Sequence, residues 1–211
     1  MDRDIQIDTF SSFFQVSRET ILGLKKYEKE LITANKNLNL VGISTINEIW
    51  IRHFLDSAQI IDFIDKNDKT LLDMGSGAGF PGLVLGLLLK ERKIGTKIKL
   101  IEKSPKKIKF LNEMIKKLEI NAITLNQNIF DEPNSFFNDV FVARAFKPLK
   151  VILELIHSKA ENWKKIFIYL GKSGKSELLE ASKSWDIEYK QRTSVTSIDS
   201  IVIEINRLVK K

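Results

Sequence analysis

The sequence contains no cysteine, and only 2 of its 211 residues are histidine. Without cysteine the chain can form neither a disulfide nor a thiolate-ligated metal site. His53 and His157 lie too far apart in the sequence for a metal-ligand spacing, so we expect no metal. No apolar run approaches the roughly 20 residues that are needed to cross a bilayer. Since the charged first residues are also unlike a signal peptide, we expect a cytoplasmic protein with no membrane partner.

Basic residues outnumber acidic ones, and unevenly along the chain. There are 34 Lys and Arg against 27 Asp and Glu, which gives a formal net charge of +7. Residues 90–117 alone hold 11 basic and 3 acidic side chains. Such a segment favours a polyanionic partner such as RNA, although a solvated lysine face would give the same pattern.

The first third of the chain is predicted to be helical. Apolar side chains recur near helical spacing over residues 10–39. Thr45 and Glu48 then form a capping-box pattern, which predicts a second helix through about Ile64. Residues 1–68 are therefore interpreted as a helical N-terminal region.

Strands and helices alternate through residues 69–211, which we predict to form one α/β domain. Strands are expected over residues 70–74, 97–102, 122–126, 139–144 and 166–170, with helices between them. Ser104 and Pro105 have the N-cap and N1 pattern of a helix start. Residues 185–193 and 200–208 alternate apolar and polar side chains, as paired half-buried strands do. This order predicts an open, mostly parallel sheet with an antiparallel ending.

The most informative segment is the run from Asp73 to Gly82, directly after the first expected strand. Glycines at positions 75, 77 and 79 lack Cβ atoms, so the backbone there can press against a ligand. Gly77-x-Gly79-x-x-Gly82 fits a dinucleotide fingerprint. Asp73, followed by glycines at alternate positions, fits the loop that binds S-adenosylmethionine (SAM). Because a carboxylate attracts the ammonium group of SAM and repels a pyrophosphate, the sequence favours SAM.

These residues resemble the RsmG (GidB) family of bacterial ribosomal RNA methyltransferases. Residues 75–82, Gly-Ser-Gly-Ala-Gly-Phe-Pro-Gly, match the SAM loop that is typical of that family. Residues 52–57 are similar to its His-x-x-Asp-Ser helix, with His53, Asp56 and Ser57 in the matching positions. Further matches in the family's order are Lys107-x-x-Phe110-Leu111 and Ala143-Arg144-Ala145. The resemblance covers almost the whole chain.

The resemblance implies a Rossmann-like class I SAM-dependent methyltransferase fold, with a mostly parallel seven-stranded sheet and an antiparallel C-terminal strand. It also implies methylation of N7 of one guanine in the 530 loop of 16S ribosomal RNA. The partner would then be that RNA or the small ribosomal subunit, and we expect the chain itself to be a monomer. The cofactor-binding residues that we predict are Asp73, Gly75, Ser76, Gly77, Gly79, Phe80, Glu102, Asn128, Ile129 and Arg144.

Separate parts of SAM are assigned to these residues. Asp73 is expected near the ammonium group, and the glycines along the amino-acid portion. Glu102, at the tip of the second strand, would accept hydrogen bonds from the ribose hydroxyls, unless it is merely an exposed glutamate. Phe80 would line the methionine end or be a plain core aromatic. Asn128 and Ile129, after the third strand, are expected to contact the adenine.

Missing residues also limit the methyl acceptor. Methylation at carbon 5 of a pyrimidine requires a cysteine nucleophile. Exocyclic amines are usually methylated beside an (Asp/Asn)-Pro-Pro-aromatic turn, and here the chain has Ala143-Arg144-Ala145-Phe146 instead. Ribose methylation usually needs a Lys-Asp-Lys-Glu set, whose aspartate would fall at Arg144. What remains is an acceptor that needs no deprotonation, and guanine N7 is one, because its lone pair is free and no general base is required.

Two basic residues are predicted to be catalytic. Arg144 would donate to guanine O6 or to an adjacent phosphate, unless it is an ordinary structural arginine. Lys172 follows the fifth strand, where the family usually has Leu-Lys-Gly, but Lys175 could fill that position instead. His53 and Asp56 either border the pocket or make a helix-surface hydrogen bond. Two other functions stay open: a nicotinamide-dependent oxidoreductase that uses the glycine loop, and a non-catalytic RNA-binding protein.

Overall fold

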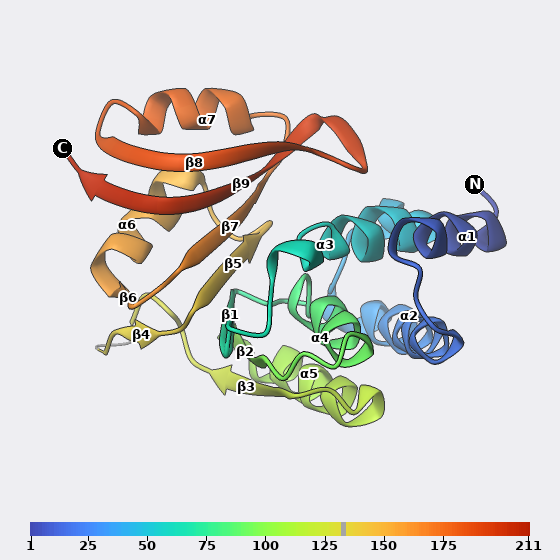
Figure 1. Cartoon of the computed structure of the whole chain (residues 1–211). Coiled ribbons are helices and arrows are strands. Elements are labelled where there is room, and N and C mark those ends of the chain that lie inside the picture. Colours follow the sequence, from blue (N-terminus) through green and yellow to red (C-terminus); the bar gives the residue numbers. More distant parts are fainter. Residues whose placement is uncertain (132–133) are drawn as a thin grey trace.

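A seven-stranded sheet forms the centre of the computed structural model, which describes residues 1–131 and 134–211 (Figure 1). Its strand order is β3-β2-β1-β5-β7-β9-β8. The strands are β1 (Thr70–Met74), β2 (Lys97–Glu102), β3 (Ala122–Asn126), β5 (Val140–Arg144), β7 (Lys165–Leu170), β8 (Trp185–Ser194) and β9 (Ser197–Lys210). Strand β9 is antiparallel to both of its neighbours, and the other pairings are parallel. The expected sheet with its antiparallel ending is therefore confirmed.

Apolar side chains on both faces explain why the sheet is covered by helices on each side. Leu71 and Leu72 in β1 point to opposite faces and are both fully buried. The crossover helices are α4 (Gly82–Glu91), α5 (Pro105–Leu118), α6 (Leu149–Lys159) and α7 (Gly174–Ala181). Helices α4 and α5 share one hydrophobic cluster with the N-terminal helices, while α6 and α7 belong to a second cluster on the other face. Ser104 caps α5, as its sequence predicts.

The N-terminal region is helical but less regular than the sequence predicts. One continuous helix was the simplest interpretation of residues 10–39, yet the chain forms α1 (Arg3–Phe14) and α2 (Arg18–Leu38). The break occurs because Gln15 adopts a left-handed conformation and the Ser17 side chain accepts a hydrogen bond from the Thr20 amide, which caps α2.

The predicted capping box at Thr45 is wrong. The segment instead consists of a 3₁₀ turn η1 (Ile43–Glu48), a π-helix η2 (Trp50–Leu55), the short α3 (Asp56–Ala58) and a second 3₁₀ turn η3 (Ile61–Phe63). The Thr45 hydroxyl donates to the Gly42 carbonyl and contacts His53, so it is not available to cap a helix.

These N-terminal helices are held by aromatic packing rather than by their own regularity. The rings of Phe10, Trp50 and Phe54 form successive edge-to-face contacts with centroids 5.1–5.7 Å apart, and all three are fully buried. Tyr27 joins them to the sheet, because its ring stacks on Phe80 and its hydroxyl donates to the Ala78 carbonyl. A boundary between residues 68 and 69 stays a prediction, and the two regions share one hydrophobic cluster.

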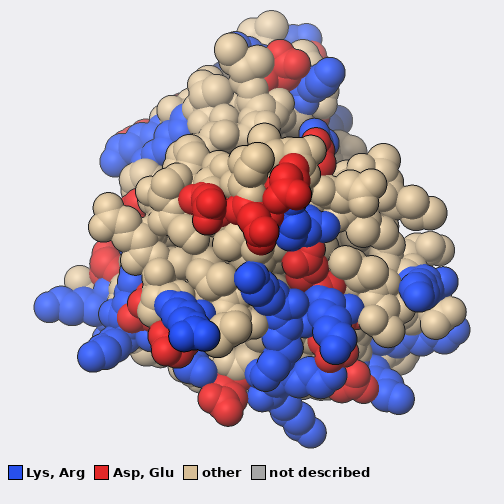
Figure 2. Space-filling view, turned by 90° about the vertical axis from the view of Figure 1, so that its right-hand side faces the viewer, with Lys and Arg blue, Asp and Glu red and all other residues tan. Residues whose placement is uncertain are grey.

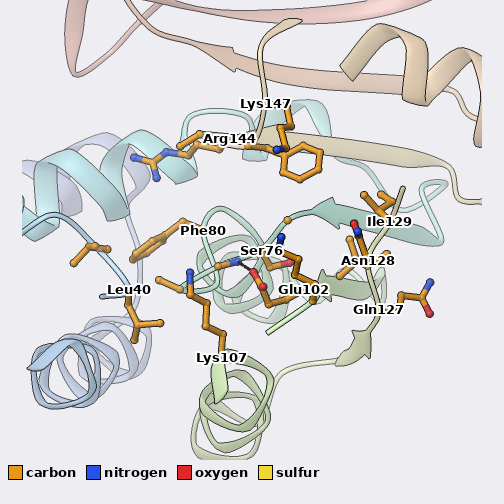
Figure 3. A pocket seen from close by; sticks show the side chains of 18 of the residues that line it. Leu40, Ser76, Phe80, Glu102, Lys107, Gln127, Asn128, Ile129, Arg144 and Lys147 are labelled. Carbon is orange, nitrogen blue, oxygen red and sulfur yellow. Dashed lines mark hydrogen bonds between the residues drawn. The ribbon is translucent and has the colours of Figure 1, made fainter. Parts of the chain in front are cut away.

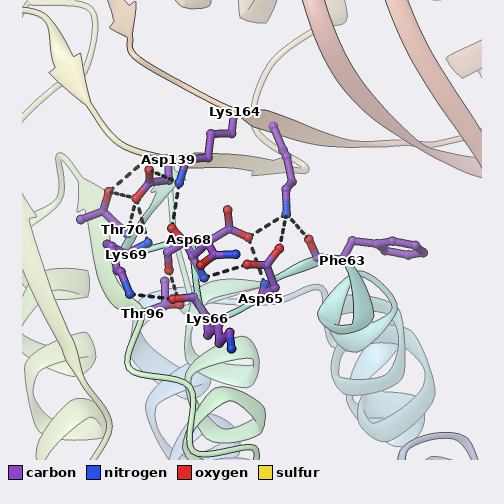
Figure 4. A network of polar contacts seen from close by, with 11 residues as sticks. Phe63, Asp65, Lys66, Asp68, Lys69, Thr70, Thr96, Asp139 and Lys164 are labelled. Atoms are coloured by element: carbon purple, nitrogen blue, oxygen red, sulfur yellow. Dashed lines mark hydrogen bonds and ion pairs between the residues drawn. The ribbon is translucent and has the colours of Figure 1, made fainter.

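Ion pairs fix the amino ends of the central strands (Figure 4). The Lys165 ammonium, at the start of β7, lies 2.7 Å from the buried carboxylate of Asp68, just before β1. Asp139, just before β5, accepts hydrogen bonds from the amides of Lys69 and Thr70 and pairs with Lys164. These contacts occupy the amino ends of the strands. A ligand is therefore expected at their opposite, carboxyl ends, where open α/β sheets bind ligands. Within the described residues, no helix is long and apolar enough to cross a membrane.

Candidate active site

A cavity of about 580 Å³ lies at the carboxyl ends of β1, β2, β3 and β5 (Figure 3). Its floor is the glycine loop, residues 75–80, and one wall comes from the tips of β2 and β3. The opposite wall is formed by residues 144–147 after β5. The N-terminal region completes the cavity with His53 and residues 40–42. Segments that are distant in the sequence thus enclose one space at the edge where open α/β sheets bind ligands.

The glycine loop has a backbone that other residues would not adopt. Gly75, Gly77 and Gly79 all have positive φ angles, of 72°, 56° and 100°. A Cβ atom at Gly79 would lie 2.3 Å from Leu83, and one at Gly75 would lie 2.2 Å from the ring of Phe146. A Cβ atom at Gly77 would meet nothing closer than 3.8 Å. The first and third glycines are therefore required by neighbouring side chains, whereas the second leaves open space beside the loop.

Glu102 is the last residue of β2, and its carboxylate connects the glycine loop to the start of α5. One carboxylate oxygen accepts from the Gly77 amide at 3.1 Å, and the other accepts from the Ser104 amide at 2.8 Å. The side chain also lines the cavity. Each oxygen retains a second lone pair, so the expected contact with ribose hydroxyls is compatible with this position and stays a prediction.

Asp73 lies beneath the loop rather than in the cavity wall. Its side chain is fully buried, and Oδ2 accepts a hydrogen bond of 3.0 Å from the Gly82 amide at the start of α4. Burial raises the pKa of Asp73 to about 7, although the Gly82 hydrogen bond opposes this rise. Oδ1 has no hydrogen-bond partner among the described residues. The observed role of Asp73 is thus to anchor the loop to α4, and its expected contact with an ammonium group stays a prediction.

Phe80 and His53 stack on each other at one end of the cavity. Their ring centroids are 5.0 Å apart and their ring planes are nearly parallel. Phe80 also packs on Tyr27. His53 Nε2 lies 2.8 Å from the Thr45 hydroxyl. Burial, aided by the nearby Arg144 charge, lowers the pKa of His53 to about 3. His53 is therefore a neutral side chain of the cavity wall at physiological pH.

Arg144 lies at the tip of β5 and is held by the N-terminal region. Its Nε donates to Asp56 Oδ2 at 2.6 Å, and Nη2 donates to the Arg52 carbonyl at 2.7 Å. The guanidinium carbon lies 5.8 Å from the centroid of the Phe80 ring. His53 therefore borders the cavity, and Asp56 orients Arg144, which lines it.

Several cavity residues were not found by sequence reasoning. Asn128 and Ile129 line the cavity as expected, but so does Phe130, whose ring stacks on Phe146 at a centroid distance of 5.8 Å. The ammonium of Lys147 lies 5.8 Å from the centroid of the Phe130 ring. The only sequence signal for Phe146 was its place two residues after Arg144. Phe130 lies in a loop, where no periodic pattern marks a contact.

Lys172 lies outside the cavity. It follows β7 on an exposed turn, and its ammonium is 3.9 Å from the carboxylate of Asp199. Lys175 is exposed as well, one residue into α7. Neither lysine is brought to the residues that line the cavity, so a substrate role for either stays a prediction. Among the described residues, no cluster of three or more His, Asp or Glu could hold a metal.

The residues at the cavity suit SAM. The open space beside Gly77 accepts a chain that runs along the loop, and Glu102 offers a carboxylate to a diol. Ile129 is buried and apolar, and the neighbouring Asn128 supplies polar atoms, as an adenine site requires. The N-terminus of α4 begins directly behind the loop.

Comparisons with known proteins show the family of the chain. The family model described as rRNA small subunit methyltransferase G (GidB) matches residues 21–205. The ribosomal RNA small subunit methyltransferase G of Pelagibacter ubique is 35% identical over 198 residues, which cover 93% of this chain and 92% of that protein. The protein of the same name from Rickettsia akari is 34% identical and covers 93% of this chain and 98% of its own length.

Solved structures share the fold. The 16S rRNA methylase RmtB has a TM-score of 0.54 at 16% identity and covers 91% of this chain and 76% of its own. TYW2 of M. jannaschii, solved in complex with AdoMet, has a TM-score of 0.53 at 17% identity and covers 77% of this chain and 78% of its own. The expected methyltransferase fold and SAM cofactor are thereby confirmed, and the chain belongs to the rRNA small subunit methyltransferase G family.

Proposed function

We propose that this chain transfers the methyl group of SAM to N7 of a guanine in the 530 loop of 16S rRNA. Methyl transfer to small-subunit rRNA follows from the family. The choice of N7, of the 530 loop and of a mechanism without a general base is the finer part of the proposal. A cytoplasmic location and a monomeric state remain predictions that accompany it.

The cofactor half of the cavity is assigned to the glycine loop and the tips of β2 and β3. Gly75, Gly77 and Gly79 would accommodate the amino-acid portion of SAM, and Glu102 the ribose. When bound, SAM supplies an electrophilic methyl group on a sulfonium sulfur. Asn128 and Ile129 would enclose the adenine, which excludes water from that end.

The observation that carries the proposal is the absence of a general base among the described residues of the cavity wall. The charged groups that line it are Lys103, Lys107, Arg144, Lys147 and Glu102. Glu102 is already bonded to two backbone amides, and the pKa of His53 is about 3. An acceptor that must lose a proton would have to compete for Glu102 with these two amides and with the ribose, so no free base is left for it. Guanine N7 needs none, so positioning and electrostatics suffice.

Arg144 is the residue that we assign to the guanine. Its Nε and Nη2 are bonded to Asp56 and to the Arg52 carbonyl, so Nη1 is the nitrogen left to meet the substrate. A guanidinium donor suits guanine O6 or a phosphate, and leaves the N7 lone pair to the methyl group. Lys172 or Lys175, on the exposed segment after β7, would contact the RNA outside the cavity.

A basic surface beside the cavity supports an RNA partner (Figure 2). Lys and Arg side chains gather over the lower part of the face that Figure 2 shows, where α2 and α5 lie. The exposed lysines of these helices are Lys25, Lys26, Lys29 and Lys36 in α2 and Lys106, Lys109, Lys116 and Lys117 in α5. Lys107, in the first turn of α5, reaches the cavity itself (Figure 3). The exposed lysines of this face, together with Lys107 at the cavity, would bind RNA phosphates.

The test is incubation of the protein with labelled SAM and, separately, with naked 16S rRNA, 30S subunits and 70S ribosomes. We expect label in the rRNA of at least one substrate, and cleavage chemistry specific for N7-methylguanine should map it to one guanine of the 530 loop. Label at another position would contradict the assigned base. Retained binding of rRNA without methyl transfer to any of the three would instead support a non-catalytic RNA-binding protein.

A further inference from the structure

An aromatic pair with no role so far lies in the cavity wall. Phe146 and Phe130 are nearly parallel, with 15° between their ring planes. Phe130 is 36% exposed, and Phe146 is half-buried. They come from different segments, since Phe146 follows β5 and Phe130 follows β3. Two large apolar rings that remain accessible beside a polar cavity are available to a planar ligand.

The ring of Phe146 is fixed in place by its surroundings. It lies so close to the Cα atom of Gly75 that a Cβ atom there would be 2.2 Å from the ring. Phe130 stacks on the Phe146 ring, and Phe146 also packs against the second hydrophobic cluster. In our assignment Gly75 lies along the amino-acid portion of SAM, so the Phe146 ring lies beside that portion too. The methyl acceptor must also be at this end of the cofactor.

We propose that the target guanine stacks on the ring of Phe146. Phe130 supports the Phe146 ring, and Lys147 binds the phosphate of the same nucleotide. This inference rests on the proposed function and deepens it by naming the residue that receives the base. Arg144 and Phe146 are separated by one residue at the tip of β5. One short segment thus offers a hydrogen-bond donor for the edge of the base and an aromatic ring for its face.

The physical reason is the energy of extracting a base from folded RNA. A guanine that is stacked on other bases or paired must be extruded from the RNA before its N7 can meet a methyl donor. Stacking on an aromatic side chain compensates for the base stacking that is lost, and proteins that bind single-stranded nucleic acids use phenylalanine in this way. Lys147 is exposed at the cavity rim, and its ammonium lies 5.8 Å from the centroid of the Phe130 ring, where a phosphate can reach it.

The experiment compares Phe146→Leu and Phe146→Tyr with wild type. Phe137→Leu is the matched control, because Phe137 is also an exposed phenylalanine but lies in β4 (Phe136–Phe137), outside the cavity. We expect Phe146→Leu to lose roughly 5- to 150-fold in kcat/KM for the rRNA substrate, the range expected when base stacking is removed. Phe146→Tyr, which keeps the ring, and Phe137→Leu should stay within about threefold of wild type. SAM affinity, measured by calorimetry, should be the same in all four proteins.

A second readout does not depend on methyl transfer. A 530-loop RNA that carries 2-aminopurine in place of the target guanine should fluoresce less when bound to wild type or Phe146→Tyr than when bound to Phe146→Leu, because stacking on the ring quenches the extruded base. Equal quenching and equal kcat/KM for Phe146→Leu and wild type would overturn the inference. A parallel loss of SAM affinity in Phe146→Leu would overturn it too, because the ring would then serve the cofactor. If wild type forms no N7-methylguanine in this loop, the proposed function itself fails, which is a separate result.

Discussion

Asp56 and Arg144 lie 88 residues apart in the chain and form an ion pair of 2.6 Å at the edge of the cavity. Both side chains are mostly buried. Asp56 Oδ1 also accepts from the hydroxyls of Ser194 and Thr196, at the turn between β8 and β9. One carboxylate therefore joins the N-terminal region, the tip of β5 and the C-terminal hairpin, and it fixes the direction of the arginine that we assign to the guanine.

The first prediction concerns this pair. Asp56→Asn keeps an acceptor for the two hydroxyls but removes the charge that holds Arg144. We expect the free energy of unfolding to fall by roughly 1–3 kcal/mol, and kcat/KM for rRNA to fall about tenfold or more as Arg144 loses its fixed direction. SAM affinity should not change. Chemical denaturation, steady-state kinetics and calorimetry measure the three quantities.

The control for this variant is Glu180→Gln. Glu180 also forms an ion pair, with Lys183, but both side chains are exposed and three residues apart in sequence. Its removal should change stability by less than about 0.5 kcal/mol and leave activity unaltered. Wild-type activity in Asp56→Asn would show that the pair is merely structural.

The regular part of this fold could be predicted from sequence because its signals are local. The strand at Leu71 and Leu72 and the cap at Ser104 depend on side chains within a few residues of each other. The interpretation of the glycine run as a SAM loop likewise needed only a carboxylate and alternate glycines. The five expected strands between residues 70 and 170 were confirmed within one residue of each end, whereas β9 is longer than the expected 200–208.

The rest depends on contacts between distant segments. Thr45 has the sequence of a helix cap, but its hydroxyl is engaged by His53 through a fold that local pattern does not show. The sequence places Asp73 near the ammonium group of SAM, which stays a prediction, but it does not show that the Asp73 carboxylate accepts from the Gly82 amide beneath the loop. Phe130 and Phe146 meet only because β3 and β5 lie on either side of the first two strands.

A second prediction is that no titration of His53 appears in the rate of methyl transfer. Because the pKa of His53 is about 3, the side chain is neutral from pH 5 to 9 and cannot gain or lose a proton in that range. The pH profiles of single-turnover rates for wild type and His53→Gln should therefore have the same shape. A limb of unit slope that is present in wild type and absent in His53→Gln would identify a general base and contradict the proposed mechanism.

A third prediction follows from the buried carboxyl group of Asp73. Its folded-state pKa of about 7 lies above the ordinary value of 3.8. Between these values the folded protein holds a proton that the unfolded chain has lost, so stability falls as pH rises through this window. Asp73→Asn should remove this dependence and still accept from the Gly82 amide. Without SAM, wild type should lose up to about 4 kcal/mol relative to the variant between pH 4 and 8.

Urea unfolding of both proteins at several pH values measures this difference, and the other titrating groups cancel in the comparison. A constant gap between the two stability curves would show that the carboxyl group keeps its ordinary pKa despite its burial.

A fourth prediction concerns the basic surface of α5. Lys106→Glu with Lys109→Glu reverses two exposed charges in the N-terminal half of α5, and a glutamate near the start of a helix interacts favourably with the helix dipole. We expect weaker rRNA binding, and a log–log salt slope smaller by about 1.4–1.8 if each lysine meets one phosphate. Lys183→Glu with Lys190→Glu changes the net charge equally beside β8, at the edge of the sheet opposite β3, and should reduce binding less. Equal effects of the two double variants would mean that only net charge matters.

The last prediction tests the contact between the glycine loop and the proposed base platform. Gly75→Ala and Gly77→Ala each place an L-residue at a positive φ angle, which costs roughly 1–2 kcal/mol at either position. Only the new methyl group at position 75 collides with Phe146. Measured without SAM, the free energy of unfolding should therefore fall further for Gly75→Ala. In the Phe146→Leu background the smaller, flexible side chain can yield, so the two glycine variants should become equally destabilising. An excess cost of Gly75→Ala that persists in that background would place the collision somewhere other than the ring.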